Sequence, residues 1–256
     1  MDSYERVHAS LSKLGLTTME STIDKYLESS HGKPVMEILD HLLSEELRHK
    51  LSKKTENMLN WSGFPFRKTM DDFDFSFQPS IDRSVIDDLM TMRYLHNNEN
   101  VVFLGPPGVG KTHLSVALGM RSILSDIQVY YTSAMKLVQT MKRDYDLNRL
   151  EYRIKTYSRF KLMIVDEIGY LPLTREESNL FFQFVSSRYQ KRSTIYTSNK
   201  GFSEWGEILG DSVMASAVLD RILHHCIVVN IRGDSYRLKD RKKNALPTER
   251  RGEKNE

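Results

Sequence analysis

Apolar positions change their spacing along the chain, and the change divides it into two parts. After Pro34 the apolar side chains recur at every third or fourth position, which is the spacing of one helix face. From about residue 70 onward, short apolar runs alternate with stretches of helical spacing. The pattern therefore predicts helices in the first part and an α/β region in the second. The stripe after Pro34 consists of Val35, Ile38, Leu39, Leu42, Leu43, Leu47 and Leu51.

The apolar runs of the second part predict strands that are separated by helices. This alternation favours a parallel sheet with helices on both of its faces. The helix after Pro172 has a capping box, because Thr174 precedes Glu177 by three positions. The strands are predicted at residues 101–105, 128–132, 162–166, 193–198 and 226–231.

The segment between the two parts contains residues that interrupt helices. Trp61–Phe66 includes a glycine and a proline, so we place a domain boundary there. Phe73, Phe75 and Phe77 then alternate with polar residues, which predicts an extended segment laid against the second part.

Residues 105–112 read Gly-Pro-Pro-Gly-Val-Gly-Lys-Thr and match the phosphate-loop template at every fixed position. An apolar run precedes the loop and a helical stretch, Lys111–Leu124, follows it without a break. In such a loop the backbone N–H groups and the helix N-terminus face the phosphates of ATP. Lys111 would reach the β- and γ-phosphates, and the Thr112 hydroxyl would bind Mg²⁺. The predicted nucleotide-binding residues are Gly105, Pro106, Pro107, Gly108, Val109, Gly110, Lys111 and Thr112.

Polar residues follow two of the predicted strands. Asp166 and Glu167 end the run that begins at Leu162, about 55 residues after the phosphate loop. Asp166 is placed to hold Mg²⁺ through its water shell, and Glu167 to orient or deprotonate the attacking water. Asn199 ends the next strand and is a candidate to hold that water or to sense the γ-phosphate, although strand-end turns also use asparagine.

Arg221 lies on a predicted helix before the last predicted strand. In a doubly wound sheet it cannot easily reach the phosphates of its own subunit, but it could reach those of a neighbour as an arginine finger. The alternative is a surface ion pair with Asp220.

Composition limits the classes to which the protein can belong. The 256 residues are 28% charged and 39% apolar, which is ordinary for a soluble globular protein. Cys226 is the only cysteine, the N-terminus has no apolar signal-peptide core, and no apolar run approaches the length of a membrane span. We expect a cytoplasmic protein without a membrane partner.

The net charge of +3 is unevenly distributed. The segment 136–161 carries eight basic and three acidic residues, and the tail from Arg237 to Glu256 carries eight basic and four acidic residues. Such clusters are typical of surfaces that bind a polyanion, above all DNA, but also of solvated helix faces. The candidate DNA-binding residues are Lys136, Lys142, Arg143, Arg149, Arg153 and Lys155.

These motifs together resemble an AAA+ ATPase of the initiator and helicase-loader clade. The match is most specific in four stretches, where the chain resembles the IstB family, the ATP-binding transposition helpers of one group of bacterial insertion sequences. The stretches are Asp166–Leu173, Thr197–Gly206, Leu219–His225 and Gly233–Arg237.

The resemblance implies roles for particular residues. Asn199 would be sensor 1, Arg221 the arginine finger that acts in trans, and Arg237 the candidate for sensor 2. The insertion at residues 134–160 corresponds to the extra helical element that faces DNA in this clade. Only about 25 residues follow the last predicted strand, so the usual three-helix lid is expected to be truncated or absent.

The resemblance also implies the organisation and function of the chain. We expect a helical domain at 1–66 for partner binding or self-assembly, an ATPase domain at 67–241 and a basic flexible tail at 242–256. The expected function is ATP-dependent homo-oligomeric assembly on duplex DNA, with ATP hydrolysis between subunits, and stimulation of the partner transposase. The alternatives are a replicative helicase loader, a small-molecule kinase and a scaffold that binds ATP without hydrolysis.

Overall fold

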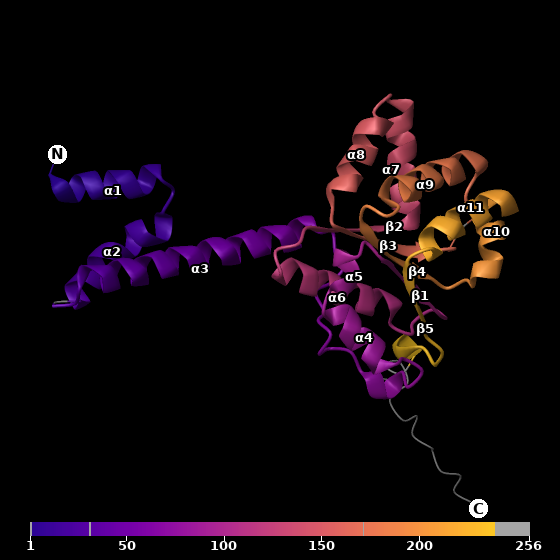
Figure 1. Cartoon of the computed structure of the whole chain (residues 1–256), viewed down its shortest axis with the longest axis horizontal. Coiled ribbons are helices and arrows are strands. Elements are labelled where there is room, and N and C mark those ends of the chain that lie inside the picture. Colours follow the sequence, from indigo (N-terminus) through magenta and orange to yellow (C-terminus); the bar gives the residue numbers. More distant parts are fainter. Residues whose placement is uncertain (1, 31, 171, 239–256) are drawn as a thin grey trace, which may run out of the picture. The chain divides into compact units, whose positions relative to one another are not determined.

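The structure is a computed structural model that describes residues 2–30, 32–170 and 172–238. The chain divides into two compact units, Met1–Asn60 and Trp61–Glu256 (Figure 1). Within the described ranges, no helix has both the length and the apolar character that crossing a membrane requires. The predicted tail at 242–256 and the last residues of the predicted ATPase domain lie outside the described residues.

The first unit consists of helices α1 (Ser3–Lys13) and α2 (Thr17–Ser29) and most of α3 (Val35–Trp61). Its core is small, because only Leu11, Met19 and Leu42 form its buried apolar cluster. Only part of the predicted stripe on α3 is therefore buried. Among the described residues of this stripe, the side chains that remain exposed are those of Val35, Leu39, Leu43, Leu47 and Leu51.

The second unit contains a five-stranded sheet in the order β2-β3-β4-β1-β5, in which all neighbouring strands are parallel. The predicted α/β class and the predicted strands are confirmed, with ends that differ by one or two residues. Because the strands are parallel, their carboxyl ends meet at one edge, where ligands bind in open α/β sheets. The strands are β1 (Asn100–Leu104), β2 (Val129–Ser133), β3 (Leu162–Ile168), β4 (Ser193–Ser198) and β5 (Cys226–Asn230).

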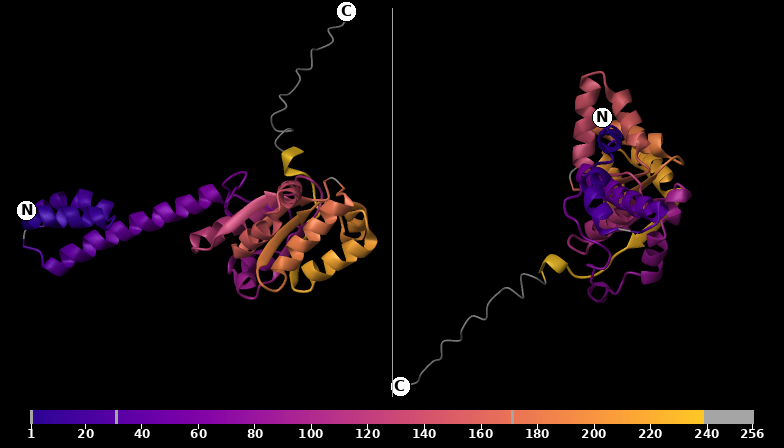
Figure 2. Two further views of the ribbon diagram at one scale, coloured as in Figure 1. Left: turned by 90° about the horizontal axis from the view of Figure 1, so that it is seen from above. Right: turned by 90° about the vertical axis from the view of Figure 1, so that its left-hand side faces the viewer.

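Helices cover both faces of the sheet (Figure 2). One face carries α6 (Lys111–Leu124), against which α4 (Arg83–Met90) and α5 (Arg93–His96) are grouped. The other face carries α7 (Ala134–Asp146), α9 (Arg175–Arg188) and α11 (Ser212–Leu223), with α8 (Leu150–Arg159) and α10 (Trp205–Leu209) packed on them. Burial on both faces explains why β1 and the first half of β3 are continuous apolar runs.

The segment before α4 packs against the second unit. The backbone N–H of Tyr131 at the sheet edge donates to the Ser62 carbonyl oxygen over 2.7 Å. The prediction of an extended segment is wrong at Phe75–Phe77, which forms the 3₁₀ helix η1. The Asp74 carboxylate accepts a hydrogen bond from the Phe77 N–H, and this local cap stabilises the turn over an extended chain.

Candidate functional site

The phosphate-loop residues connect β1 to the N-terminus of α6. Gly110 is the N-cap of α6 in a left-handed conformation with φ +102°, and Gly108 has φ +84°. A Cβ atom on Gly108 would lie 2.1 Å from Ser235 Oγ, and one on Gly110 would lie 2.5 Å from the Phe73 ring. Only glycine fits at these two positions, because both the backbone angle and the neighbouring atoms exclude a side chain.

The Lys111 side chain lies folded on its own loop. Its Nζ donates to the carbonyl oxygens of Gly105 and Pro106 over 2.7 and 2.8 Å. Burial lowers the pKa of the Lys111 amine, the Asp166 charge opposes this effect, and the Arg237 charge adds to it. The amine is thus partly desolvated at the point where an anionic ligand would be most favourable.

The Asp166 carboxylate is buried at the carboxyl end of β3, with an exposed fraction of 2%. Thr112 Oγ1 lies 3.1 Å from its Oδ1 and 3.0 Å from its Oδ2. Tyr131 donates to Oδ2 over 2.6 Å, and Thr197 donates to Oδ1. Burial and the Asp166 charge raise the pKa of the Tyr131 phenol, which therefore stays protonated as a donor. The hydroxyl groups of Thr112, Tyr131 and Thr197 therefore surround the Asp166 carboxylate at the end of β3.

Glu167 lies in an irregular stretch of β3, where the pairing with β4 shifts between Val165 and Ile168. Its φ is +61°, a left-handed conformation that is unusual for a residue other than glycine. The Glu167 N–H donates to Thr197 Oγ1 over 2.9 Å, and its side chain is exposed. The bulge directs Glu167 out of the sheet while Asp166 stays buried.

A cavity of about 320 Å³ lies beside the loop, and most of the predicted site residues line it. The loop from Pro107 to Thr112 forms one wall, and Glu167, Asn199 and Arg237 approach from other segments. Gly105 and Pro106 are not in this lining; their carbonyl oxygens hold Lys111 instead. The Asn199 position follows from the sheet order, because β4 lies between β1 and β3.

The cavity is also lined by the segment before α4, which no sequence motif predicts, and by Tyr236, next to the predicted Arg237. Before α4, the Thr69 carbonyl oxygen lies 2.8 Å from His113 Nε2, and Phe66 and Phe73 pack edge-on against the His113 ring. After β5, the Tyr236 N–H donates to the Gly108 carbonyl oxygen over 3.0 Å. The alternation of Phe73 with polar residues indicated a segment laid against the second part, but its contact with His113 depends on the fold.

Arg221 lies outside the lining of this cavity. Its Nη1 donates to the Ala217 carbonyl oxygen over 3.0 Å, and its guanidinium stacks 4.5 Å from the centre of the Phe182 ring. The stacking holds the guanidinium between α11 and α9. Arg221 is therefore separate from the cavity beside the phosphate loop.

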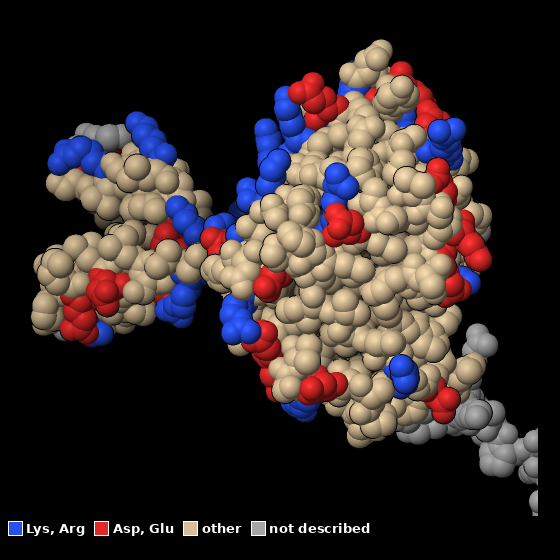
Figure 3. All heavy atoms as spheres, turned by 45° about the vertical axis from the view of Figure 1, so that its right-hand side comes forward, with Lys and Arg blue, Asp and Glu red and all other residues tan. Residues whose placement is uncertain are grey.

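The basic segment 136–161 forms α7, α8 and the turn between them. Figure 3 shows basic side chains gathered along the edge of the second unit where α8 lies in Figure 1. Some of the predicted DNA-binding residues are paired within the chain. Arg153 pairs with the buried Asp144, Lys142 with Glu176 over 3.1 Å, and Lys155 with Glu151 over 2.7 Å. Arg143 is exposed but also lies 3.7 Å from the Asp144 carboxylate, and Lys136 and Arg149 are exposed.

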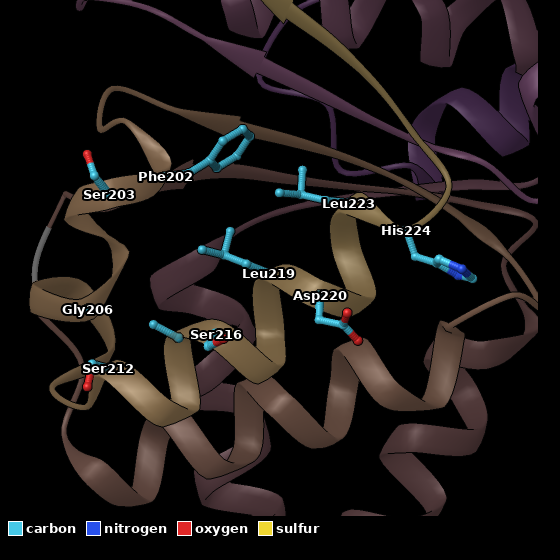
Figure 4. A pocket seen from close by; sticks show the side chains of 10 residues that line it. Phe202, Ser203, Gly206, Ser212, Ser216, Leu219, Asp220, Leu223 and His224 are labelled. Atoms are coloured by element: carbon cyan, nitrogen blue, oxygen red, sulfur yellow. The ribbon is translucent and has the colours of Figure 1, made fainter.

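A second hollow lies away from the phosphate loop, between α10 and α11. It is an open groove of about 630 Å³ that Phe202, Leu219, Asp220 and Leu223 help to line (Figure 4). Neither the phosphate loop nor Asp166 and Glu167 contribute to it. The 320 Å³ cavity is thus the candidate site.

A model of the family described as "IstB-like ATP binding protein" matches residues 9–244. The chain belongs to this family. The IstB-like chain is 42% identical over 240 residues to the insertion sequence IS21 putative ATP-binding protein of Pseudomonas aeruginosa, covering 93% of this chain and 91% of the relative. It is also 42% identical over 241 residues to the insertion sequence IS232 putative ATP-binding protein of Bacillus thuringiensis subsp. berliner, covering 93% and 96%.

The fold of this IstB-like chain is similar to that of a replication initiator. The AMPPCP-bound DnaA of Aquifex aeolicus superposes with a TM-score of 0.54 at 20% identity, covering 71% of this chain and 55% of DnaA. At this identity the likeness concerns the fold alone. The predicted AAA+ architecture, with a phosphate loop and a parallel sheet flanked by helices, is confirmed.

Proposed function

We propose that this IstB-like protein hydrolyses ATP between subunits, assembles on duplex DNA in the ATP-bound state and stimulates the transposase of its insertion sequence. One observation carries the proposal. Lys111, Thr112, Glu167, Asn199 and Arg237 come from separate parts of the chain and line one cavity beside the buried Asp166. These are the groups that binding and hydrolysis of a triphosphate require.

The residues of the cavity fit ATP and Mg²⁺. The left-handed glycines leave room for phosphate oxygens at the N-terminus of α6, where backbone N–H groups are free to bind an anion. Thr112 and Asp166 present hydroxyl and carboxylate oxygens, the ligands that Mg²⁺ prefers. When bound, Mg²⁺ would neutralise charge on the phosphates.

The remaining residues of the site have distinct roles in this proposal. When ATP binds, the Lys111 amine leaves the carbonyl oxygens of Gly105 and Pro106 and donates to the β- and γ-phosphate oxygens instead. Glu167 orients or deprotonates the attacking water, and Asn199 holds that water as sensor 1. Arg237 lies close enough to Lys111 to affect its pKa, which supports contact with the phosphates from the same subunit.

Arg221 acts on the site of a neighbouring subunit. Its position outside the cavity of its own chain and its support by Phe182 favour this role over a pair with Asp220. A guanidinium stacked on an aromatic ring keeps its charge and a fixed direction, which suits a residue that completes another subunit's site. A contact of this head-to-tail kind propagates into a ring or a helix of subunits.

Duplex DNA binds along the α7–α8 segment in this assembly. The exposed side chains of Lys136, Arg143 and Arg149 are available to neutralise phosphates, although Arg143 also lies 3.7 Å from the Asp144 carboxylate. Arg153 is less exposed and pairs with the same carboxylate. Binding through phosphates positions the protein on DNA with little base readout.

The transposase is the proposed partner, and the relatives support it, because those reported above are named as insertion-sequence proteins. We assign partner binding or self-assembly to the helical domain at 1–66, with the ATPase domain at 67–241. The helical domain has exposed apolar side chains on α3, among them Leu43 and Leu47, which suit contact with another protein.

The experiment is a strand-transfer assay with the transposase of the same insertion sequence, duplex target DNA and either ATP or ADP. We expect the wild-type protein to stimulate transfer with ATP and to lose this effect with ADP. Equal transfer with and without the protein would contradict the proposal. A pull-down that recovers a hexameric helicase in place of the transposase would support the helicase-loader alternative.

A further inference from the structure

Two hydroxyl groups with no assigned role hold the carboxylate of Asp166. Besides Thr112, the residues that contact its oxygens are Tyr131 on β2 and Thr197 on β4, the strands on either side of β3. We propose that Tyr131 and Thr197 are positioning residues that orient Asp166 toward Thr112, and that Thr197 also holds the backbone of Glu167 beside Asp166. The inference rests on the proposed function, because it assigns these residues to the Mg²⁺ and water positions of that site.

The direction of each hydrogen bond at Thr197 follows from the chemistry of its partners. A backbone N–H can only donate, so Thr197 Oγ1 accepts from the Glu167 N–H over 2.9 Å. An ionised carboxylate can only accept, so the same hydroxyl donates its proton to Asp166 Oδ1. Thr197, with an exposed fraction of 1%, therefore connects the two acidic residues through one oxygen atom.

This connection stabilises an unfavourable backbone conformation. Glu167 has φ +61°, and a residue with a side chain occupies that region only where its surroundings hold it there. The bond from its N–H reaches the buried Thr197 hydroxyl, so losing this partner would leave the backbone of Glu167 without that support. Thr197 thus sets the direction in which the Glu167 side chain leaves β3.

Tyr131 approaches Asp166 from the other side and is itself held in place. Its backbone N–H donates to Ser62, and its ring packs edge-on against Phe64 with centroids 6.4 Å apart. The half-buried phenol then donates to Asp166 Oδ2 over 2.6 Å. With donors on both oxygens, the carboxylate plane is fixed before any ligand binds. Partners of this kind around metal ligands typically affect metal affinity or activity by about 10–100-fold.

The first test measures the Mg²⁺ requirement of nucleotide binding in the Tyr131→Phe variant. The change keeps the backbone bond to Ser62 and the ring contact with Phe64, and removes only the donor to Asp166. We expect the Mg²⁺ concentration for half-maximal binding of a fluorescent ATP analogue to rise about tenfold. Binding of the analogue without Mg²⁺ should be unchanged. Tyr130→Phe is the matched control, because Tyr130 packs with Tyr157 and Phe160.

The second test separates binding from hydrolysis at Thr197. Thr197→Val keeps the shape and removes the hydroxyl, and we expect kcat to fall about 10–100-fold while affinity for the ATP analogue at saturating Mg²⁺ is retained. Thr197→Ser keeps the hydroxyl and should recover most of kcat. Thr132→Val is the control on β2, because its buried hydroxyl donates to the neighbouring Ser133 carbonyl oxygen.

The outcomes distinguish this inference from the proposed function. If the wild-type protein binds the ATP analogue without any dependence on Mg²⁺, the proposed site itself is wrong. If the wild type depends on Mg²⁺ and Tyr131→Phe matches it, the role of Tyr131 is overturned. If Thr197→Ser is as slow as Thr197→Val while both variants are folded, the hydroxyl is not the group that matters and the role of Thr197 is overturned.

Discussion

Lys111 illustrates how single residues are prepared for a ligand. Its amine makes its hydrogen bonds to the carbonyl oxygens of Gly105 and Pro106 at one end of the loop. Neutral carbonyls are weaker partners for an ammonium group than phosphate oxygens are. A triphosphate would therefore draw the amine away from the loop, and burial of the site strengthens that attraction.

Replacing Lys111 by alanine should abolish ATP binding. The change removes the cation while the glycine backbone of the loop remains. We expect no saturable binding of a fluorescent ATP analogue at concentrations that saturate the wild type, measured by titration. Lys191→Ala, at an exposed position outside the cavity, should bind like the wild type. Tight binding by Lys111→Ala would exclude the phosphate-loop site.

In the first unit, the buried side chain of Glu46 stabilises the fold. Its buried carboxylate accepts hydrogen bonds from the N–H groups of Thr18 and Met19 at the start of α2. Burial raises the pKa of Glu46, but these hydrogen bonds and the Lys50 charge outweigh burial and hold the pKa below its ordinary value of 4.5. A group with a lowered pKa stabilises the fold above its ordinary pKa and loses this effect as the pH falls through the folded-state value.

The Glu46→Gln variant should therefore lower the Tm of the first unit in a pH-dependent way. At pH 7 we expect a decrease of roughly 4–8 °C by calorimetry, because the charged acceptor at the start of α2 is lost. The difference from the wild type should begin to shrink as the pH falls below about 4.5 and should be lost below the lowered folded-state pKa, where the wild-type carboxylate is neutral as well. Glu45→Gln, whose carboxylate pairs with Arg48, is the control. A difference that is constant with pH would contradict the role of charge.

At the scale of elements, α7 and α8 form a helical pair in which one basic side chain joins the helices and others remain exposed. Arg153 on α8 pairs with the buried Asp144 on α7 and thereby joins the two helices. Removing one member of such a pair typically costs about 3–5 kcal/mol, because the other charge stays buried. Arg153 therefore belongs to the fold, and the exposed residues of the segment are the ones to test for DNA binding.

Reversal of Lys136 and Arg149 to glutamate should weaken DNA binding without unfolding the helical pair, because the ion pairs of Asp144 are with Arg143 and Arg153. Each lost phosphate contact should lower the slope of log K against log salt by about 0.9. The measurement is a salt series of fluorescence anisotropy with labelled duplex DNA in the presence of ATP. Reversal of the exposed Arg121 and Lys191 is the control of equal charge. An unchanged slope in the first variant would remove the α7–α8 segment from the DNA interface.

At the scale of the whole molecule, each cavity in the proposed assembly is completed by Arg221 of a neighbouring subunit. The cavity contains the phosphate loop and Glu167, whereas Arg221 lies on α11 against Phe182. Each site is then complete only when a second copy is present. Hydrolysis should consequently depend on protein concentration and on assembly.

Mixing two inactive variants should restore hydrolysis if the site is shared. Arg221→Ala should bind ATP but lose about 10³–10⁵ in rate, and Glu167→Gln should also be inactive. In an equal mixture, about one quarter of the interfaces combine an intact Glu167 with an intact Arg221, so phosphate release should recover to a comparable fraction. A mixture of Glu167→Gln with Lys111→Ala should stay inactive, because both residues belong to the same side. Absence of recovery in the first mixture would argue against a shared site.

The strands and the phosphate loop were predictable because their signals are local. A strand buried on both faces needs an apolar run, and the left-handed turns at Gly108 and Gly110 need glycine, so each pattern can be recognised without knowing its neighbours. The 3₁₀ turn at Phe75–Phe77 was missed because one carboxylate, that of Asp74, outweighed the alternation of aromatic and polar residues.

The sequence by itself determined the α/β class, the loop that binds phosphate and the two carboxylates beside it, because short segments encode them. Only the tertiary structure decided which side chains support these groups. The order β2-β3-β4 brings Tyr131 and Thr197 to Asp166, and the pairing of α7 with α8 joins Arg153 to Asp144. These contacts depend on distances between segments far apart in the chain, which no local pattern of residues contains.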